Sequence, residues 1–468
     1  MSHATKAIQL EMFEDPELGS SFQVMDGQSR ICNWLFNHLL ELADQLRKQA
    51  RESGDFESAK SVYTKRGLRN WIPDLKEQFP FLRSVHSSPL KNAALRLSAA
   101  IREHQKGKKG EWKRQTGWPG FRSWKQRWFS LLYDEPNKGY KLEGNVITFS
   151  LGVNEKEERL KASFRLREAS VLKGYEIRNV RVTRCNGRMY AIFTVEVPLP
   201  EKKPVNTFIA LDPNHKNLAY GVDHEGSAVE IEAPYWLKKH DKKLDELKSR
   251  RDRCRKKSKK LAVLDSRHQP TGKEYYVPSR QWLKRHQVYE RELHRSREQK
   301  KTYMYTVSHK LFRHYDGVAI GDYTPRGGGK SRKMSRSMNN RSLIGKFKEV
   351  LHWVATKLGK TMWVYDEKGT TRTCHACGYV VPEGLEPSIR AWRCPCCHFE
   401  HCRDENAAIH GHRRILRDLQ QTGEVNSSVP SSGPVFIRKR CAWRVLPSGV
   451  ISTLRGLEQR VRLAAPSN

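Results

Sequence analysis

The 468-residue sequence predicts a multidomain α+β protein, and three successive patterns along the chain support this fold class. Apolar residues recur at helical spacing over residues 21–105, as at Leu35, Leu39 and Leu42. Between residues 138 and 200, β-branched and aromatic runs indicate strands. The second half combines apolar strands that end in an acid with amphipathic helices and a cysteine cluster. The length allows two to four domains.

The elements of the first half follow from local pattern. Residues 7–12 predict a short strand before the helical segment. Val146–Phe149 and Met189–Val195 are the clearest strands, and Asn186-Gly187 before the second is a dipeptide typical of tight hairpins. These signals are local, so they predict elements and turns rather than the pairing of strands.

In the second half, residues 208–212, 318–322 and 362–365 predict buried strands. Residues 218–231 predict a hairpin, and an amphipathic helix is expected over 343–358. Another helix is expected to begin near Asp404. Residues 236–315 are expected to be helical and highly charged, and the polar run 426–434 predicts a flexible tail over 422–468.

The charge of the chain indicates a polyanionic partner. Lys and Arg number 87 against 51 Asp and Glu, which gives a formal net charge of +36. Such an excess is self-repulsive unless phosphates neutralise it. No apolar run is long enough to span a membrane, and no signal peptide is evident. Charge alone is equally consistent with a nucleic-acid-binding protein that has no catalytic activity.

Two basic segments are candidates for the nucleic-acid surface. Residues 106–128 interleave cations with tryptophans, which suits backbone neutralisation with base stacking, although the tryptophans could instead anchor a loop to a core. Residues 242–260 hold eleven Lys or Arg against three acids, which favours a helix facing nucleic acid over an ordinary solvated face. The candidate contact residues are Trp112, Lys113, Trp118, Arg122, Lys125, Arg253, Lys256, Lys257 and Lys260.

The cysteines predict a structural zinc site. Six of the ten lie between residues 374 and 402, and Cys374-x-x-Cys377 and Cys394-x-x-Cys397 form two knuckles. Four thiolates suit tetrahedral Zn²⁺ with no open position for a catalytic water. Cys396 competes with Cys397 as the fourth ligand, and the preference for Cys397 rests on the CxxC spacing. A local cluster in a chain of this kind indicates a reducing compartment rather than disulfides.

Three acids that are distant in sequence form the candidate catalytic site. Asp212 and Asp322 end apolar strands, and Asp404 begins a helix directly after the cysteine cluster. Converging carboxylates can hold two Mg²⁺ or Mn²⁺ ions about 3.5–4 Å apart, which suits hydrolysis of a phosphodiester. Each Asp alone is more often a turn or cap residue, so the prediction rests on their joint occurrence.

Four segments resemble one family. "IALDPNHKNLAYGVDHEGSAVEI", "VAIGDYTP", "TTRTCHACGY…RCPCCH" and "RDENAAI" are similar to the split RuvC motifs of the TnpB nucleases encoded by transposons and of their descendants, the compact type V CRISPR effectors. The looser matches "SRICNWLFNHLLEL" and "TGWPGFRSWKQR" extend the resemblance over roughly residues 5–420. It implies that Asp212 is the first catalytic carboxylate and Asp404 the last.

The chain departs from the family at the middle motif. The family usually has Glu at the end of this strand, and Gly321 occupies that position here, followed by Asp322. Three alternatives remain open. Asp322 is the middle metal ligand, Glu349 on the following helix replaces the lost acid, or the site is inactive.

The resemblance implies a bilobed architecture. A helical recognition domain (21–118) is expected within a small β-barrel (1–20 and 119–204). An RNase-H-like RuvC domain (205–370 and 403–421) follows, with a basic helical insertion (236–315) and a zinc finger that binds target nucleic acid (371–402).

The implied activity is RNA-guided cleavage of double-stranded DNA beside a short motif that the protein recognises. A cytoplasmic, prokaryotic setting is expected, with association to the nucleoid when target is bound. The alternatives are an RNA-guided binder without nuclease activity and a DDE transposase, which the finger before Asp404 disfavours. The sequence leaves open whether the protein acts alone or as a homodimer.

Overall fold

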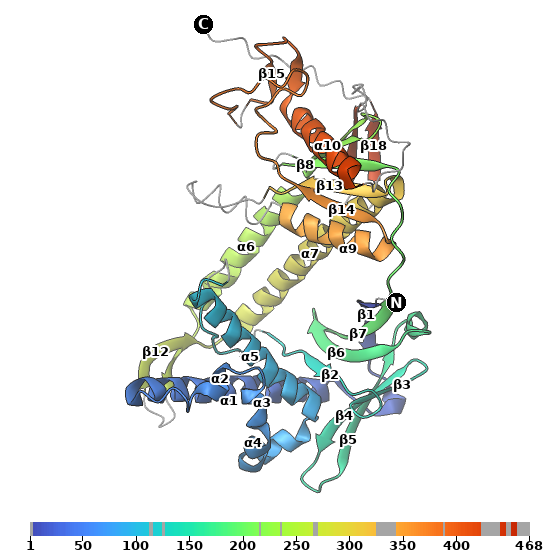
Figure 1. The fold of residues 1–468 in the computed structure, drawn as a ribbon. Coiled ribbons are helices and arrows are strands. Elements are labelled where there is room, and N and C mark those ends of the chain that lie inside the picture. The colour runs from blue at the N-terminus through green and yellow to red at the C-terminus, as the bar shows by residue number, and fades with distance from the viewer. Residues whose placement is uncertain are drawn as a thin grey trace. The chain divides into compact units, whose positions relative to one another are not determined.

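The computed structural model describes residues 3–111, 116–123, 127–214, 217–234, 236–264, 270–323, 343–386, 389–422, 440–445 and 451–455. The chain divides into two compact units, residues 1–198 and 199–468, each with its own core (Figure 1). No helix in the described ranges is long and apolar enough to cross a membrane.

The first unit combines a seven-stranded antiparallel sheet with helices. The strand order is β2-β6-β7-β1-β5-β4-β3. Apart from η3, which follows β5, the helices lie between β1 and β2 in the sequence. The described pairings do not join β2 to β3. The strands are β1 (His3–Phe13), β2 (Leu131–Tyr133), β3 (Tyr140–Glu143), β4 (Val146–Val153), β5 (Arg159–Leu166), β6 (Ile177–Cys185) and β7 (Arg188–Pro198). The helices are η1 (Pro16–Leu18), α1 (Phe22–Ser53), α2 (Lys60–Tyr63), α3 (Gly67–Asn70), α4 (Ile72–Gln78), η2 (Pro80–Ser84), α5 (Ser87–Lys108) and η3 (Ala169–Leu172).

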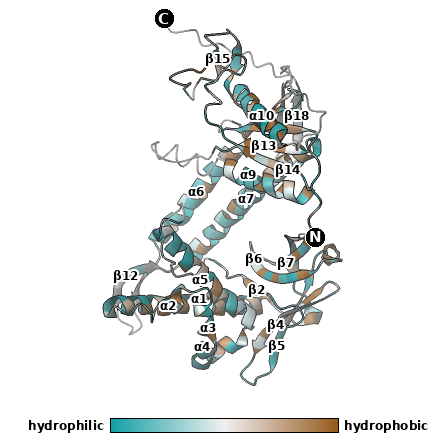
Figure 2. Ribbon diagram, viewed as in Figure 1, coloured by the Kyte–Doolittle hydropathy of each residue, from teal (hydrophilic) through white to brown (hydrophobic). Residues whose placement is uncertain are grey.

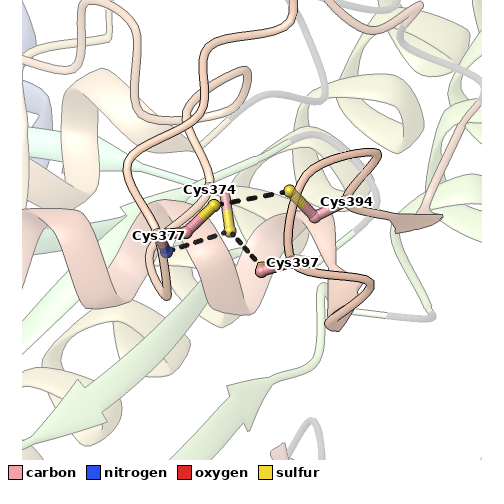
Figure 3. A group of neighbouring side chains, drawn as sticks. All are labelled: Cys374, Cys377, Cys394 and Cys397. Carbon is pink, nitrogen blue, oxygen red and sulfur yellow. Dashed lines mark hydrogen bonds between the residues drawn. The ribbon is translucent and has the colours of Figure 1, made fainter.

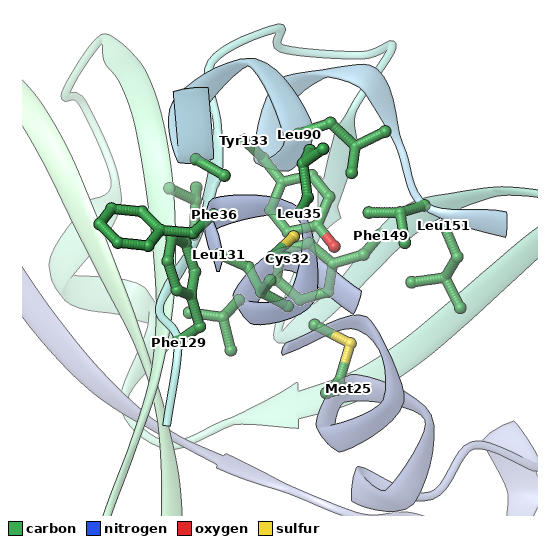
Figure 4. Packing of buried hydrophobic residues seen from close by; sticks show 14 of the residues in the cluster. Met25, Cys32, Leu35, Phe36, Leu90, Phe129, Leu131, Tyr133, Phe149 and Leu151 are labelled. Atoms are coloured by element: carbon green, nitrogen blue, oxygen red, sulfur yellow. The ribbon is translucent and has the colours of Figure 1, made fainter. Parts of the chain in front are cut away.

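Local signals explain where the long helix α1 begins and ends. Ser21 caps its first turn by accepting a hydrogen bond from the backbone N–H of Gln23, and Gly54 ends it with a positive φ of 75°. The buried face of α1 packs with α5 and the sheet in one apolar core (Figure 4). Asn186 and Gly187 both have positive φ between β6 and β7, which confirms the predicted hairpin turn.

The second unit is built on a mixed sheet. Its strand order is β14-β13-β8-β9-β10-β17-β18. Strands β8, β13 and β14 are parallel, whereas β8, β9 and β10 form an antiparallel meander. The strands of this sheet are β8 (Phe208–Pro213), β9 (Ala219–Asp223), β10 (Ala228–Ile231), β13 (Gly317–Gly321), β14 (Thr361–Tyr365), β17 (Arg440–Val445) and β18 (Ile451–Arg455). The predicted strands at 208–212, 318–322 and 362–365 are therefore confirmed to within a residue.

Helices cover both faces of this sheet. On one face, Ile209, Leu211 and Ile320 pack with α7 (Arg280–His314) and α9 (Ile344–Leu358). On the other face, Phe208 and Ala319 pack with α10 (Arg403–Thr422). This second face carries Asp212 at its edge, so α10 and the strand ends together frame the candidate site.

The C-terminal segment differs from the expected flexible tail. Strands β17 and β18 lie within 422–468, and β17 pairs in parallel with β10. The polar run at 426–434 lies outside the described residues. Local composition predicted the tail, but the edge of β10 offers unpaired backbone groups that a distant segment satisfies. Such non-local pairing leaves no local signal.

The basic insertion contains strands as well as helices. Helix α6 (Leu237–Lys256) packs against α7, and the β11–β12 hairpin (Lys260–Leu264 and Pro270–Tyr276) connects them. The buried Glu292 on α7 binds α6 by accepting from His240 Nδ1 at 2.9 Å and from Lys243 Nζ at 2.7 Å. Outside this contact, both helices are mainly hydrophilic (Figure 2). The sequence predicted the helices and missed the hairpin.

Candidate carboxylate and cysteine sites

Asp212 lies at the carboxyl end of β8, on the face covered by α10. Only 6% of the residue is exposed. No described residue donates a hydrogen bond to its carboxylate, which is unusual for a buried acid. Burial raises the pKa of Asp212 well above its ordinary value, and the charges of Glu367 and Asp404 raise it further. The charges of Glu367 and Asp404 therefore act on the same buried carboxylate.

Asp404 opens helix α10 beside two arginines. Arg390 Nη1 donates to Asp404 Oδ1 at 2.9 Å, and Arg403 is close enough for its charge to lower the pKa of Asp212. Burial lowers the pKa of Arg403 itself, and the positive charge of Arg390 lowers it further. A carboxylate at a helix N-terminus is stabilised by the helix dipole. Asp404 therefore has a defined position, and its carboxylate remains available for further contacts.

Glu367 is a member of this group that sequence reasoning missed. It follows β14 by two residues, and burial raises its pKa to about 7. The backbone N–H of Tyr323 donates to its carboxylate and opposes that rise. Its Oε1 is buried and has no hydrogen-bond partner among the described residues. In sequence, Asp366-Glu367 resembles an ordinary polar turn after a strand, so no local signal marked it.

The two candidates for the middle acid lie in different surroundings. Asp322 is exposed, and its Oδ1 accepts from the backbone N–H of Glu367 at 3.1 Å. Glu349 lies on α9 with a side chain 74% exposed, 3.9 Å from Lys346 Nζ. Its charge is not among those with the largest effects on the pKa of Asp212. The structure places Asp322 beside Glu367 and leaves Glu349 outside the group.

The raised pKa of Asp212 makes a prediction for stability. Because the folded state holds the proton more tightly than the unfolded state, the ionised carboxylate destabilises the fold above its ordinary pKa of about 3.9. Asp212→Asn should therefore raise the Tm by about 2 °C or more at pH 7.5 without added divalent cation. The gain should shrink as the pH falls towards 4. A thermal shift series over pH measures this, and an unchanged or lower Tm at pH 7.5 would contradict it.

The four cysteines of the two knuckles converge (Figure 3). Their Sγ atoms all lie within 4.8 Å of one another. Cys374 and Cys397 Sγ are 3.7 Å apart, and Cys377 and Cys394 Sγ are 3.6 Å apart. Zn–S bonds of about 2.3 Å in a tetrahedron place sulfurs about 3.8 Å apart, so the set fits Zn²⁺. Cys397, rather than Cys396, completes the group, as the CxxC spacing predicts.

The finger is attached to the helix that carries Asp404. Asn406 is fully buried, and its Nδ2 donates to the carbonyls of Thr370 and Thr373 at 2.8 Å. Its Oδ1 accepts from the backbone N–H of His375 at 3.0 Å. Thr373 and His375 flank Cys374. One side chain of α10 therefore links the first knuckle to the start of the helix, two residues from Asp404.

The candidate contacts in residues 106–128 give a different result. Trp112, Lys113 and Lys125 lie outside the described residues. Trp118 packs internally, with the Arg47 guanidinium 3.7 Å from its ring centroid. The Arg122 guanidinium lies over Phe129 at 5.0 Å, and burial lowers its pKa. For Trp118 and Arg122, the anchoring alternative describes the observed contacts.

The candidates near the end of α6 are on the surface. Arg253, Lys256, Lys257 and Lys260 are exposed. Lys260 Nζ pairs with Glu274 at 2.8 Å, whereas no described acid pairs with Lys256 or Lys257. Exposed cations without intramolecular partners remain free for phosphate contacts. The α6 terminus is therefore the best-supported part of the predicted nucleic-acid surface.

Comparison with known proteins places these residues in context. Residues 345–410, which include Glu367, the four knuckle cysteines and Asp404, match the family described as Cas12f1-like, TNB domain. The chain is similar to the solved Cas12f1–sgRNA–target DNA complex, with 11% sequence identity, a TM-score of 0.52, and coverage of 87% of this chain and 98% of that chain. It is also similar to the mini-RNA-guided endonuclease CRISPR-Cas_phi3, with 11% identity, a TM-score of 0.40, and coverage of 88% and 92%. No curated protein sequence matches the chain.

Proposed function

We propose that this chain, which carries the Cas12f1-like TNB domain and has the fold of the solved Cas12f1 protein, is an RNA-guided DNA endonuclease. The observation that carries the proposal is the buried Asp212 carboxylate beside Asp404 and Glu367, with no hydrogen-bond donor among the described residues. Burying several carboxylates together is strongly unfavourable unless cations compensate them, and the charges of Arg390 and Arg403 leave the pKa of Asp212 raised. A protein that only binds nucleic acid gains nothing from such a group.

The carboxylates suit hydrolysis of a phosphodiester. Asp212 and Asp404 would hold two Mg²⁺ or Mn²⁺ ions, which activate water and stabilise charge on the leaving oxygen. Tyr365 supports the strand end that carries Asp212, because its hydroxyl donates a hydrogen bond to the carbonyl of Leu211 at 2.9 Å. Arg390 fixes the orientation of Asp404. The rigid strand and helix ends thereby keep the acids in place before substrate arrives.

The zinc finger and the basic surface would serve binding rather than chemistry. The cysteine group is complete with four protein ligands, so a bound Zn²⁺ would stabilise the finger. The net charge of +36 suits contact with two nucleic acids, a guide RNA and a double-stranded DNA target. Base pairing with the guide would select the target, and the protein would recognise a short adjacent motif. The alternative, a guided binder without cleavage, is favoured only by Gly321.

The test uses the full chain purified with its copurifying RNA. Sequencing that RNA should give a defined species with a variable end. Plasmids carrying the complement of that end beside a randomised flank should then be cut in the presence of Mg²⁺. Target binding without cutting in Mg²⁺ and in Mn²⁺ would leave the guided binder as the better account. Copurification of no defined RNA would contradict guidance itself.

Reversing the charge of the α6 terminus should weaken nucleic-acid binding. For Lys256→Glu combined with Lys257→Glu, we expect the slope of log Kobs against log salt to become shallower by about one to two, because each lost phosphate contact removes about 0.7–0.9. Filter binding to RNA and to duplex DNA from 50 to 300 mM salt measures the slope.

The matched control is Lys256→Arg with Lys257→Arg, which preserves both charges and should preserve the slope. An unchanged slope in the Glu variant would show that these lysines belong to an ordinary solvated surface and do not contact phosphates.

A further inference from the structure

We propose that Glu367 is the middle metal-binding carboxylate of the site, and that the lack of a side chain at Gly321 leaves the space that its carboxylate occupies. This rests on the proposed nuclease function and adds a catalytic residue to it. Asp322 becomes a positioning residue. The proposal accounts for a chain that keeps the first and last acids of the site while lacking an acid at the end of β13.

Strand register defines where a middle acid has to be. In the parallel pair β8 and β13, Ile320 lies opposite Leu211, so Gly321 lies beside Asp212. Residues two apart in a strand share a face, and Ala210 and Ala319 both lie on the face covered by α10. A side chain at position 321 would therefore point to the same side as Asp212, about 5 Å away across the strand pair.

The carboxyl group of Glu367 occupies that position. A Cβ built on Gly321 would coincide with the Glu367 carboxylate. Gly321 lies opposite Tyr365 in the pair of β13 and β14, and Glu367 is two residues beyond Tyr365. Glu367 thus continues on the face of Tyr365 and turns back over the neighbouring strand. The acid missing from β13 is supplied by the loop after β14.

Asp322 holds the loop in this conformation. Its backbone N–H donates to the carbonyl of Tyr365 at 2.9 Å, and its Oδ1 accepts from the backbone N–H of Glu367 at 3.1 Å. These two bonds clamp residues 365–367 against the end of β13. The Asp322 carboxylate is exposed, whereas the Glu367 carboxylate extends towards Asp212. The charge of Lys348 acts on both acids.

A buried acceptor without a donor, beside a buried acid, points to a cation. Only 6% of Asp212 is exposed, and its carboxylate receives no hydrogen bond from a described residue. Oε1 of Glu367 is buried and has no hydrogen-bond partner within the described part of the chain. Buried carboxylate oxygens are normally satisfied by donors, and a divalent cation is the ligand that satisfies several at once. The charge of Glu367 also acts on Asp212 more strongly than that of Asp404.

The central experiment moves the carboxylate from one strand to the other. Glu367→Gln should weaken Mn²⁺ binding at least about tenfold in isothermal titration of the full chain and abolish Mg²⁺-dependent cleavage. Gly321→Glu should also be inactive, because two side chains then compete for one space. The combination Gly321→Glu with Glu367→Ala should recover Mn²⁺ affinity and part of the cleavage. Gly321 has no positive φ, so the substitution introduces no backbone strain.

Variants of Asp322 distinguish a positioning role for this residue from a role as metal ligand. Asp322→Asn keeps an oxygen that accepts from the N–H of Glu367, so it should retain Mn²⁺ affinity and cleavage within about threefold. Asp322→Ala loses the clamp and should lose part of both. If Asp322 were instead the metal ligand, Asn would be as inactive as Ala. Thermal unfolding of each variant identifies loss of fold.

The outcomes separate this proposal from the nuclease function. Cleavage that requires Asp212 and survives Glu367→Gln would overturn the role of Glu367 and leave the function intact. Mn²⁺ binding that requires Glu367 in a protein that never cuts would support the ligand and overturn the function. If the double variant folds and binds no Mn²⁺, Gly321 is not the equivalent position, and the proposal fails.

Discussion

Asp212→Asn is expected to lower the rate of target cleavage at least about 10³-fold while leaving the binding of guide RNA and target within about threefold. The change removes a charge and one metal ligand at the end of β8 and preserves the shape of the side chain. Cleavage depends on metal at the developing charge. Binding depends on lysines and arginines elsewhere, such as those at the end of α6. Single-turnover cleavage and filter binding on the same preparation measure the two effects.

Asp223 provides a matched control, because it is equally buried at 6% exposure in the adjacent strand β9. Its Oδ1 accepts from the backbone N–H groups of Glu225 and Ser227, and its Oδ2 accepts from Tyr315 at 3.0 Å. Asp223→Asn should lower the Tm and leave cleavage at 25 °C largely intact. Asp404→Ala should behave like Asp212→Asn. Equal loss of cleavage in the Asp212 and Asp223 variants would indicate general damage to the sheet.

Sequence pattern predicted those parts of the site that depend on local signals. Buried strands that end in Asp212 and in Gly321-Asp322 were visible as apolar runs, and the register of parallel strands brings their ends together. The knuckle spacing identified all four cysteines. The sequence also identified the absence of an acid at position 321. Each of these features lies within a few residues of the signal that reveals it.

Other features depend on contacts between distant segments. Glu367 belongs to the acidic group only because β14 lies beside β13 and Gly321 leaves a space, neither of which is visible around residue 367. The pairing of β17 with β10 is equally non-local. Trp118 lies in a segment whose composition suggests base stacking, yet the guanidinium of Arg47, a residue of α1, stacks on its ring. Gly321 did indicate a missing acid, but the sequence suggested Glu349 as its replacement, whereas the carboxylate beside Gly321 is that of Glu367.

Replacing Cys397 with Ser should remove the bound zinc and destabilise the finger. Wild-type protein should carry about one Zn²⁺ by elemental analysis, and Cys397→Ser substantially less, because four thiolates define the site. Zinc binding in comparable fingers contributes about 10–16 kcal/mol to folding, so loss of a ligand should expose residues 371–402 to proteolysis. The adjacent Cys396→Ser is the control. Cys396 is exposed and outside the group, so that variant should keep its zinc and its resistance.

Loss of zinc should also disable cleavage, although no cysteine belongs to the carboxylate group. Asn406 connects the start of α10 to the carbonyls of Thr370 and Thr373 beside the first knuckle, so a disordered finger removes the contacts that fix this end of the helix. Asp404 lies two residues away, and catalytic carboxylates have to be held to within about 0.5 Å. Cys397→Ser should therefore reduce cleavage more than tenfold, and Cys396→Ser should not. A zinc-free Cys397→Ser protein that cuts at the wild-type rate would show that the sheet alone positions Asp404.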